Sequence, residues 1–249
     1  MSSHRIGLIV PSSNTTMETE VPELLRRQQQ DNGMDTFTFH SSRMRMQEVS
    51  REELARMDAE SDRCALELSD ARCDVLAYAC LVAIMSMGNG YHRVSQDRLA
   101  AVAAANGAAV PVVSSAGALI DALTSLGVRR TAILTPYLKP LTDLVAGYIE
   151  DAGVEVADRI SLEVPDNLEV GRLDPADLLG HARKLDLNGV DALVLSACVQ
   201  MPSLPAVQQV EDELGLPVIT AATATARSIL LSLQITPQIR GAGQLLAQP

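Results

Sequence analysis

The sequence predicts an α/β protein with two similar lobes, each built on a mainly parallel four-stranded sheet. Two observations lead to this fold class. Short runs of Val, Ile, Leu and Ala alternate with longer amphipathic stretches, which is typical of β-α-β units. The second half of the chain then repeats short motifs of the first half in the same order. A duplicated unit predicts two lobes related by a pseudo-twofold axis, with the active site in the cleft between them.

The first half supplies the alternation. Strands are expected at residues 5–11, 36–40 and 75–80, and helices at 17–30, 51–69 and 96–106. Thr15 and Glu18 have the spacing of a capping box, so the first helix should begin there with backbone N–H groups that suit a carboxylate. Residues 81–90 are apolar and end in glycine, which fits either a lid over a bound molecule or a plain loop.

The second half repeats three of these segments. Residues 132–136 resemble 6–11, residues 193–198 resemble 75–80, and residues 216–219 resemble 110–113. A further helix is expected to begin within 201–205, where two prolines stand near its first turn, and to end at Gly215. Its free N–H groups would lie near Cys198 and favour the thiolate of that residue.

Two cysteines hold equivalent places in the repeat, because Cys80 and Cys198 each end a buried strand and each follow an alanine. A free cysteine is commonly an inert, small apolar residue, but that interpretation loses weight when the position is duplicated. Open α/β sheets bind their ligands at the carboxyl ends of their strands, so both thiols should face one pocket. Cys64 and Cys73 lack this context and are assigned to packing or to the surface.

Composition excludes several classes of function. A net charge of −11 and the scarcity of aromatic residues, with no Trp, argue against nucleic acid and anionic membranes as partners. No apolar stretch is long enough to cross a bilayer, and no signal peptide is visible, so we expect a cytoplasmic protein. The cysteines and the four scattered histidines show no metal-ligand spacing, so we expect neither a metal nor a cofactor.

The sequence resembles the aspartate/glutamate racemase superfamily and, within it, the maleate cis–trans isomerase family. The segments that carry the resemblance lie in order along the chain, at 7–20, 78–80, 135–137, 165–167 and 196–198, with the block Pro-Ser-Ser-Asn in the first. The resemblance implies cofactor-independent conversion of maleate to fumarate by a homodimer, in nicotinate degradation. It also implies a covalent, succinyl-like cysteine adduct.

Carried over residue by residue, the resemblance implies that Cys80 is the nucleophile and that Cys198 is the partner thiol that donates or accepts a proton. The remaining residues assigned to substrate binding are Asn14, Tyr137, Asn167, Leu81, Val82 and Val199. From the residues alone, both asparagines equally fit turns, and the tyrosine equally fits a half-buried aromatic. The resemblance assigns the two asparagines and the tyrosine to the substrate carboxylates, which neutral donors stabilise without proton exchange.

The resemblance also implies that the chain crosses between the lobes. The first lobe should comprise residues 1–110 and 217–249 and carry Cys80, and the second should comprise 111–216 and carry Cys198. The exchange is expected at the repeated strands near 110–113 and 216–219.

Other functions remain open. A cofactor-independent amino-acid racemase uses two cysteines, but Asn-Thr typically follows its first cysteine and Thr its second. Leu81 and Val82 follow Cys80 here, and Val199 follows Cys198. An arylmalonate decarboxylase uses only the second-half cysteine, so Cys80 disfavours that activity. A non-catalytic small-anion binding protein could also use a duplicated α/β fold, but it would not need two thiols at symmetric positions.

Overall fold

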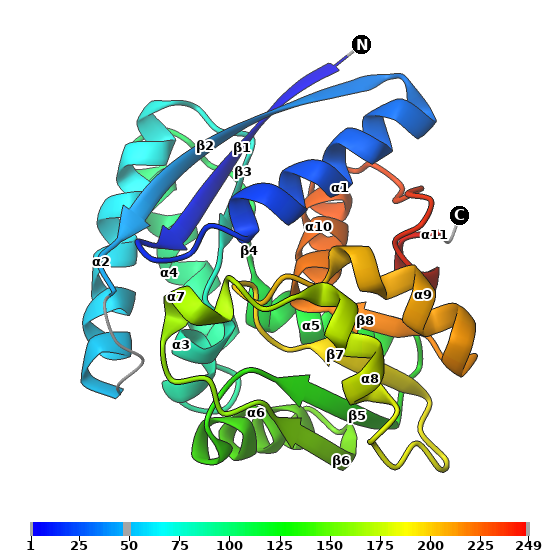
Figure 1. The fold of residues 1–249 in the computed structure, drawn as a ribbon. Coiled ribbons are helices and arrows are strands. Elements are labelled where there is room, and N and C mark those ends of the chain that lie inside the picture. The colour runs from blue at the N-terminus through cyan, green and yellow to red at the C-terminus, as the bar shows by residue number, and fades with distance from the viewer. Residues whose placement is uncertain (1, 47–50, 248–249) are drawn as a thin grey trace.

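The fold comprises two four-stranded parallel sheets with helices packed around them (Figure 1). The structure is a computed structural model that describes residues 2–46 and 51–247. The strand orders are β2-β1-β3-β4 in the first sheet and β6-β5-β7-β8 in the second. Adding four to each strand number of the first sheet gives the strand order of the second sheet, as expected for a pseudo-twofold duplication. The predicted fold class is therefore confirmed.

The first half of the chain forms the first sheet and the helices around it. Strand β1 pairs in parallel with β2 on one side and with β3 on the other. The expected strands and helices of this half are all present, with longer bounds at half of their ends. The elements are β1 (Ser2–Pro11), α1 (Met17–Asn32), β2 (Asp35–Met44), α2 (Arg51–Asp70), β3 (Val75–Tyr78), α3 (Leu81–Ser86), α4 (Tyr91–Ala105) and β4 (Val112–Ser114).

The second half forms the second sheet in the same way. The predicted helix after Cys198 is present as α9, and Gly215 ends it with a φ of 66°, a backbone conformation that favours glycine. The elements are α5 (Ser115–Ser125), β5 (Arg130–Thr135), α6 (Lys139–Asp151), β6 (Glu155–Ser161), α7 (Asn167–Val170), the 3-10 helix η1 (Pro175–Asp177), α8 (Leu178–Ala182), β7 (Ala192–Ser196), α9 (Leu204–Leu214), β8 (Val218–Thr220), α10 (Ala221–Ser232) and α11 (Gln244–Ala247).

Strands β3 and β7 hold equivalent inner positions in the two sheets. β3 lies between β1 and β4, and β7 lies between β5 and β8. Every residue of both strands is buried, because helices cover both faces of a parallel sheet. This burial explains why the sequence of each strand is almost wholly apolar. Cys80 and Cys198 follow two residues after these strands end.

The chain exchange between lobes differs from the sequence expectation by a few residues. The expected division placed 111–113 in the second lobe and 217–219 in the first. Hydrogen bonding instead places β4 in the first sheet and β8 in the second. The chain crosses after these strands, since α10 packs on α1, β3 and β4 of the first lobe and α5 packs against α10. Short strands carry no sequence mark that tells which sheet they join.

The start of α1 also differs from the expectation. The helix begins at Met17, and the Thr15–Glu18 capping box is not formed. Asn14 supplies the cap instead, because its Oδ1 accepts a hydrogen bond of 3.1 Å from the backbone N–H of Met17. Glu18 pairs with Arg43 of β2. The segment after Cys80 was expected to be a lid or a loop. Its residues 81–85 are buried in helix α3 and belong to the core.

A buried polar cluster supports the end of β3. Asp58 of α2, which is 2% exposed, accepts hydrogen bonds from the hydroxyls of Tyr78 at 3.1 Å and Tyr91 at 2.7 Å. Arg98 of α4 forms an ion pair with the same carboxylate at 3.0 Å. Because buried polar groups need partners, this cluster ties α2, β3 and α4 together just before Cys80.

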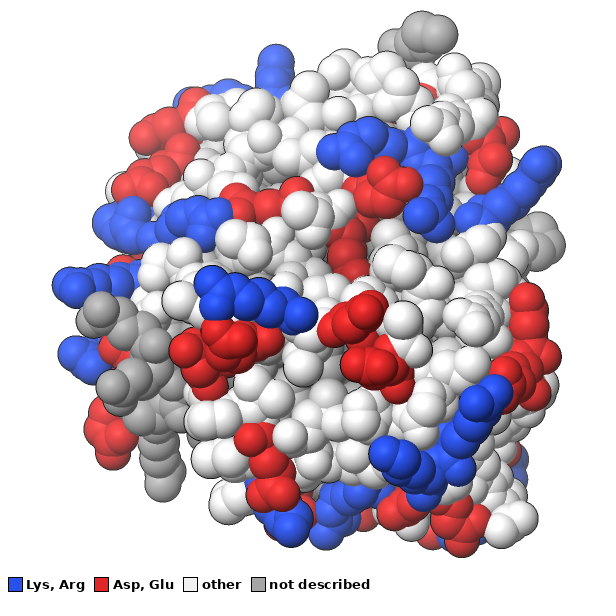
Figure 2. Space-filling view, viewed as in Figure 1, with Lys and Arg blue, Asp and Glu red and all other residues white. Residues whose placement is uncertain are grey.

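Charged groups of both signs lie over the surface. On the face in Figure 2, acidic and basic side chains are interspersed, and the basic ones form no continuous patch. Among the residues that the structure describes, no helix combines the length and the apolar character needed to cross a membrane.

We expect Gly7→Ala to lower the free energy of unfolding by about 1–3 kcal/mol, because it overpacks the core. A Cβ on Gly7 would lie 2.6 Å from Cδ2 of Leu76 and 3.2 Å from Sγ of Cys73, and both neighbours are buried. Urea denaturation followed by circular dichroism measures the change. Gly147→Ala in α6 is the matched control, since nothing lies within 4 Å of its Cβ. Equal stability of the two variants would contradict this account of the β1–β3 contact.

Candidate active site

The two thiols of the repeat meet in one cavity. Cys80 is the residue before α3, and Cys198 lies in the loop between β7 and α9. Both line a cavity of about 20 Å³ and are nearly buried, at 6% and 5% exposure. This volume is close to that of one bound water. A larger ligand therefore requires the walls to move apart when it binds.

The structure brings every site residue predicted from the sequence to this cavity. The first lobe supplies four of them and the second lobe the other four. Three further lining residues were missed by the sequence analysis. Pro11 opens the Pro-Ser-Ser-Asn block and Gln200 directly follows Val199, and these were the available signals, whereas nothing in the sequence marked Met46. The predicted residues are Asn14, Cys80, Leu81, Val82, Tyr137, Asn167, Cys198 and Val199.

Burial controls the protonation of Cys80. Desolvation raises the pKa of this thiol to about 12, because the thiolate loses the water that would stabilise its charge. The backbone N–H of Ala83 in α3 lowers the pKa, but by less than burial raises it. The nearby Cys198 and Asp58 raise it further through charge repulsion. The free protein therefore holds Cys80 as a thiol near neutral pH.

Cys198 has more groups that favour its thiolate. Burial raises its pKa, while the Tyr137 hydroxyl and the backbone N–H groups of Gln200 and Met201 lower it. The Tyr137 hydroxyl also lies 3.4 Å from the carbonyl oxygen of Ala197. Burial raises the pKa of Tyr137 well above its usual value, so this phenol stays a neutral donor.

The two asparagines both line the cavity and are both nearly buried. Oδ1 of Asn14 caps α1. Its Nδ2 has no hydrogen-bond partner among the described residues and is available to a ligand. Nδ2 of Asn167 donates to Oγ of Ser13 at 2.7 Å, so Ser13 is a further neighbour that the sequence analysis missed. Both side chains are neutral amides that can donate to a carboxylate.

The cavity therefore combines two thiols with neutral donors, and none of its lining residues is basic. Within residues 2–46 and 51–247, no group of three His, Cys, Asp or Glu side chains could hold a metal ion. No histidine lines the cavity, and the buried His92 instead bonds the Tyr148 hydroxyl at 2.6 Å. Such a site can add a thiolate to an electron-poor carbon, move a proton, and bind carboxylates through amide and phenol groups.

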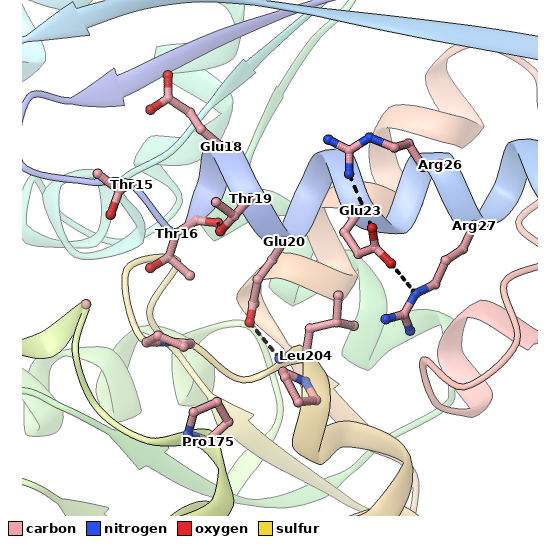
Figure 3. Close-up of a pocket in the computed structure, with 13 residues that line it drawn as sticks. Thr15, Thr16, Glu18, Thr19, Glu20, Glu23, Arg26, Arg27, Pro175 and Leu204 are labelled. Atoms are coloured by element: carbon pink, nitrogen blue, oxygen red, sulfur yellow. Dashed lines mark hydrogen bonds and ion pairs between the residues drawn. The ribbon is translucent and has the colours of Figure 1, made fainter.

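A larger hollow of about 740 Å³ lies along α1 and contains neither cysteine (Figure 3). Its charged groups are already paired. Glu23 forms ion pairs with Arg26 and Arg27, and Glu20 accepts a hydrogen bond from the backbone N–H of Leu204. Size alone therefore does not mark the reactive site, and the small cavity with the two thiols is the better candidate.

Comparison with known proteins gives consistent matches. The family model for arylmalonate decarboxylase matches residues 6–246. The curated maleate isomerase of Geobacillus stearothermophilus is 61% identical, over 99% of each chain. A maleate isomerase structure from Pseudomonas putida, of a cysteine-to-alanine variant with maleate, is 56% identical with a TM-score of 0.97, over 98% of each chain.

A maleate cis-trans isomerase structure from Nocardia farcinica is 49% identical with a TM-score of 0.95, over 99% of each chain. It is a cysteine-to-serine variant with a covalently bound succinylcysteine intermediate. In that protein, the cysteine that carries the adduct is therefore not the one that was replaced.

The raised pKa of Cys80 predicts how its alkylation depends on pH in the free protein. Iodoacetamide reacts with the thiolate, whose fraction grows about tenfold per pH unit below the pKa. With a pKa of about 12, the rate should keep rising from pH 7 to pH 10 without a plateau. Peptide-resolved mass spectrometry measures this rate. A rate that levels off between pH 9 and pH 10, as for an ordinary exposed thiol, would show that Cys80 is not held in its neutral form.

Proposed function

The chain belongs to the arylmalonate decarboxylase family and, at closer range, to the maleate isomerases, and on that premise we propose that it converts maleate to fumarate. One observation carries this proposal: two thiols from equivalent places in two lobes line one cavity together with neutral carboxylate donors. The high identity to maleate isomerases over nearly the whole chain supports maleate as the substrate.

Cys80 is the nucleophile in this proposal. In the reactive state one of the two thiol protons has passed to solvent. Cys198, which has more groups that support its thiolate, takes the remaining proton from Cys80, so that Cys80 attacks as the thiolate and Cys198 becomes the thiol. A bond forms between Sγ of Cys80 and one alkene carbon, and the π electron pair moves toward the other carbon and its carboxylate. The Cys198 proton then passes to that second carbon, which gives a succinyl group on Cys80. The N–H of Ala83 supports the starting thiolate.

Rotation about the former double bond, which the addition has made a single carbon–carbon bond, converts the cis arrangement into the trans one. The Cys198 thiolate then removes a proton from the second carbon, the double bond re-forms, and the bond to Cys80 breaks. Fumarate leaves, and the two thiols again share one proton. The Tyr137 hydroxyl and the backbone N–H groups near Cys198 stabilise its thiolate during this cycle.

Asn14, Asn167 and Tyr137 bind the two carboxylates in this proposal. Negative charge grows toward one carboxylate during the addition, so preorganised donors there lower the barrier. Leu81, Val82 and Val199 form apolar walls beside the two cysteines. No acidic residue lines the cavity, so the site offers no carboxylate partner for the ammonium group of an amino acid and suits a dicarboxylate that lacks this group.

The succinylcysteine in the Nocardia farcinica variant supports a covalent route with separate tasks for two cysteines. The cytoplasmic homodimer and the role in nicotinate degradation stay predictions. They rest on the sequence alone. Light scattering coupled to size-exclusion chromatography tests the dimer.

We expect native protein to convert maleate to fumarate and Cys80→Ala to abolish this turnover, because the variant cannot form the carbon–sulfur bond. Proton NMR of maleate incubated with reduced, metal-stripped protein measures both. Cys64→Ala is the matched control, since Cys64 is equally buried but lies in α2 outside the cavity. No fumarate from well-folded native protein would contradict the proposal, and racemisation of aspartate and glutamate in D₂O would then be followed.

Cys198→Ser should accumulate the covalent intermediate. Addition of the Cys80 thiolate remains possible, with the proton supplied by solvent, but serine is too weak a base to remove it again. Intact-mass spectrometry after incubation with maleate should show a gain of one maleic acid per chain. The double variant with Cys80→Ala should show no gain. An adduct that persists in the double variant would place the nucleophile elsewhere.

A further inference from the structure

The side chain of Gln200 uses all four hydrogen-bonding positions of its amide. Oε1 accepts from the backbone N–H groups of Thr15 at 3.1 Å and Thr16 at 3.5 Å. Nε2 donates to the carbonyl oxygens of Ser13 at 3.1 Å and Asn167 at 3.0 Å. The residue is 3% exposed. A buried amide with four partners is fully satisfied, and it fixes the groups that it contacts.

These partners surround both asparagines of the site. Ser13 and Thr15 are the residues before and after Asn14, so the amide holds the turn that presents Asn14. Its contact with Asn167 is to the backbone of that residue. Gln200 itself follows Cys198 by two residues. One side chain therefore sets the mutual positions of Asn14, Asn167 and Cys198, which come from three separate segments of the chain.

Gly171 provides the space that this amide needs. A Cβ on Gly171 would lie 2.5 Å from Nε2 of Gln200 and 3.2 Å from its Cδ. The φ of Gly171 is −70°, so any residue could adopt its backbone conformation. Alanine at this position is therefore disfavoured by the Gln200 side chain rather than by backbone strain.

Two more contacts hold the Cys198 loop against α1. The Thr16 hydroxyl donates to the carbonyl oxygen of Gln200 at 2.7 Å. At the other end of the loop, Oε1 of Glu20 accepts from the backbone N–H groups of Ser203 at 2.6 Å and Leu204 at 2.7 Å. Figure 3 shows Glu20 reaching from α1 to Leu204. The loop is thus anchored at both ends, and Gln200 is the anchor next to the cavity.

We propose that Gln200, in the space left by Gly171, is a positioning residue that fixes the relative positions of the two carboxylate-binding asparagines. This inference rests on the proposed function. It adds to that function a residue that affects substrate binding indirectly, by holding Asn14 and Asn167 in place. The two thiols supply the chemistry, whereas Gln200 determines how well the dicarboxylate is held for it.

The test uses two variants that disturb the amide differently. Gly171→Ala displaces the Gln200 side chain without removing any group that lines the cavity, and Gln200→Met removes the hydrogen bonds without adding charge. Gly180→Ala in α8 and Gln30→Met on the exposed face of α1 are the matched controls, since nothing lies within 4 Å of a Cβ at Gly180. Steady-state kinetics with maleate, calorimetric titration with succinate and alkylation of Cys80 by iodoacetamide are measured on each.

Both test variants should raise the KM for maleate and the Kd for succinate by at least about fivefold, since lost binding to the carboxylates weakens every bound state. Alkylation of Cys80 should stay within about twofold of the native rate, because iodoacetamide does not use the asparagines. The controls should match the native protein. A general structural role would instead change the alkylation rate along with binding.

Unchanged KM and Kd in Gly171→Ala, with an active native protein, would overturn the positioning role. Binding that weakens together with much faster Cys80 alkylation would overturn it as well. Gly171→Ala alone decides the matter if Gln200→Met does not fold. A native protein that binds succinate but makes no fumarate would contradict the proposed isomerisation, and the succinate titrations would still judge the positioning role.

Discussion

The position of the site depends on two inner parallel strands. Hydrogen bonding on both sides holds β3 and β7 in register with their neighbours, and helices bury both of their faces. A strand held in this way fixes the position of the residues that follow its carboxyl end. Because the unit is duplicated, β3 positions Cys80 and β7 positions Cys198, and both cysteines line the same cavity. The polar cluster around Asp58 holds the carboxyl end of β3 through the hydroxyl of Tyr78, the last residue of that strand.

The electrostatics of the cavity follow from burial. Removing water raises the pKa of both thiols, which makes their thiolates stronger bases and nucleophiles when they form. Neutral amides, a phenol and backbone N–H groups then bind the anion. Such groups stabilise developing charge without adding a fixed positive charge that would hold the product as tightly as the substrate. The acidic surface and the anion-binding cavity are thus compatible, because the donors act locally.

The sequence predicted the fold class, the strands and helices of the first half, the helix after Cys198 and eight of the residues that line the cavity. Buried parallel strands and amphipathic helices leave strong periodic patterns, and the duplication marked Cys80 and Cys198 as equivalent, whereas the other six site residues came from the resemblance to a known family. The prediction failed where a local pattern competes with tertiary contacts. Asn14 rather than Thr15 caps α1, and both partners of the reciprocal half of a Thr15–Glu18 capping box are engaged elsewhere, since the Thr15 N–H donates to Gln200 and Glu18 pairs with Arg43. Residues 81–85 form a buried helix rather than a lid, because they pack against α2, α4, α5 and α6.

By itself, the sequence decided what chemistry is available: two thiols, neutral donors and apolar walls. Only the tertiary structure decided how these groups are placed relative to one another. Gln200, Gly171, Ser13 and Glu20 join segments that lie up to 187 residues apart, and no local period records such contacts. The sheet that each of β4 and β8 joins was decided in the same way. The reason is physical: propensity acts over a few neighbouring residues, whereas the partners of a buried amide or a short strand are set by the packing of the whole chain.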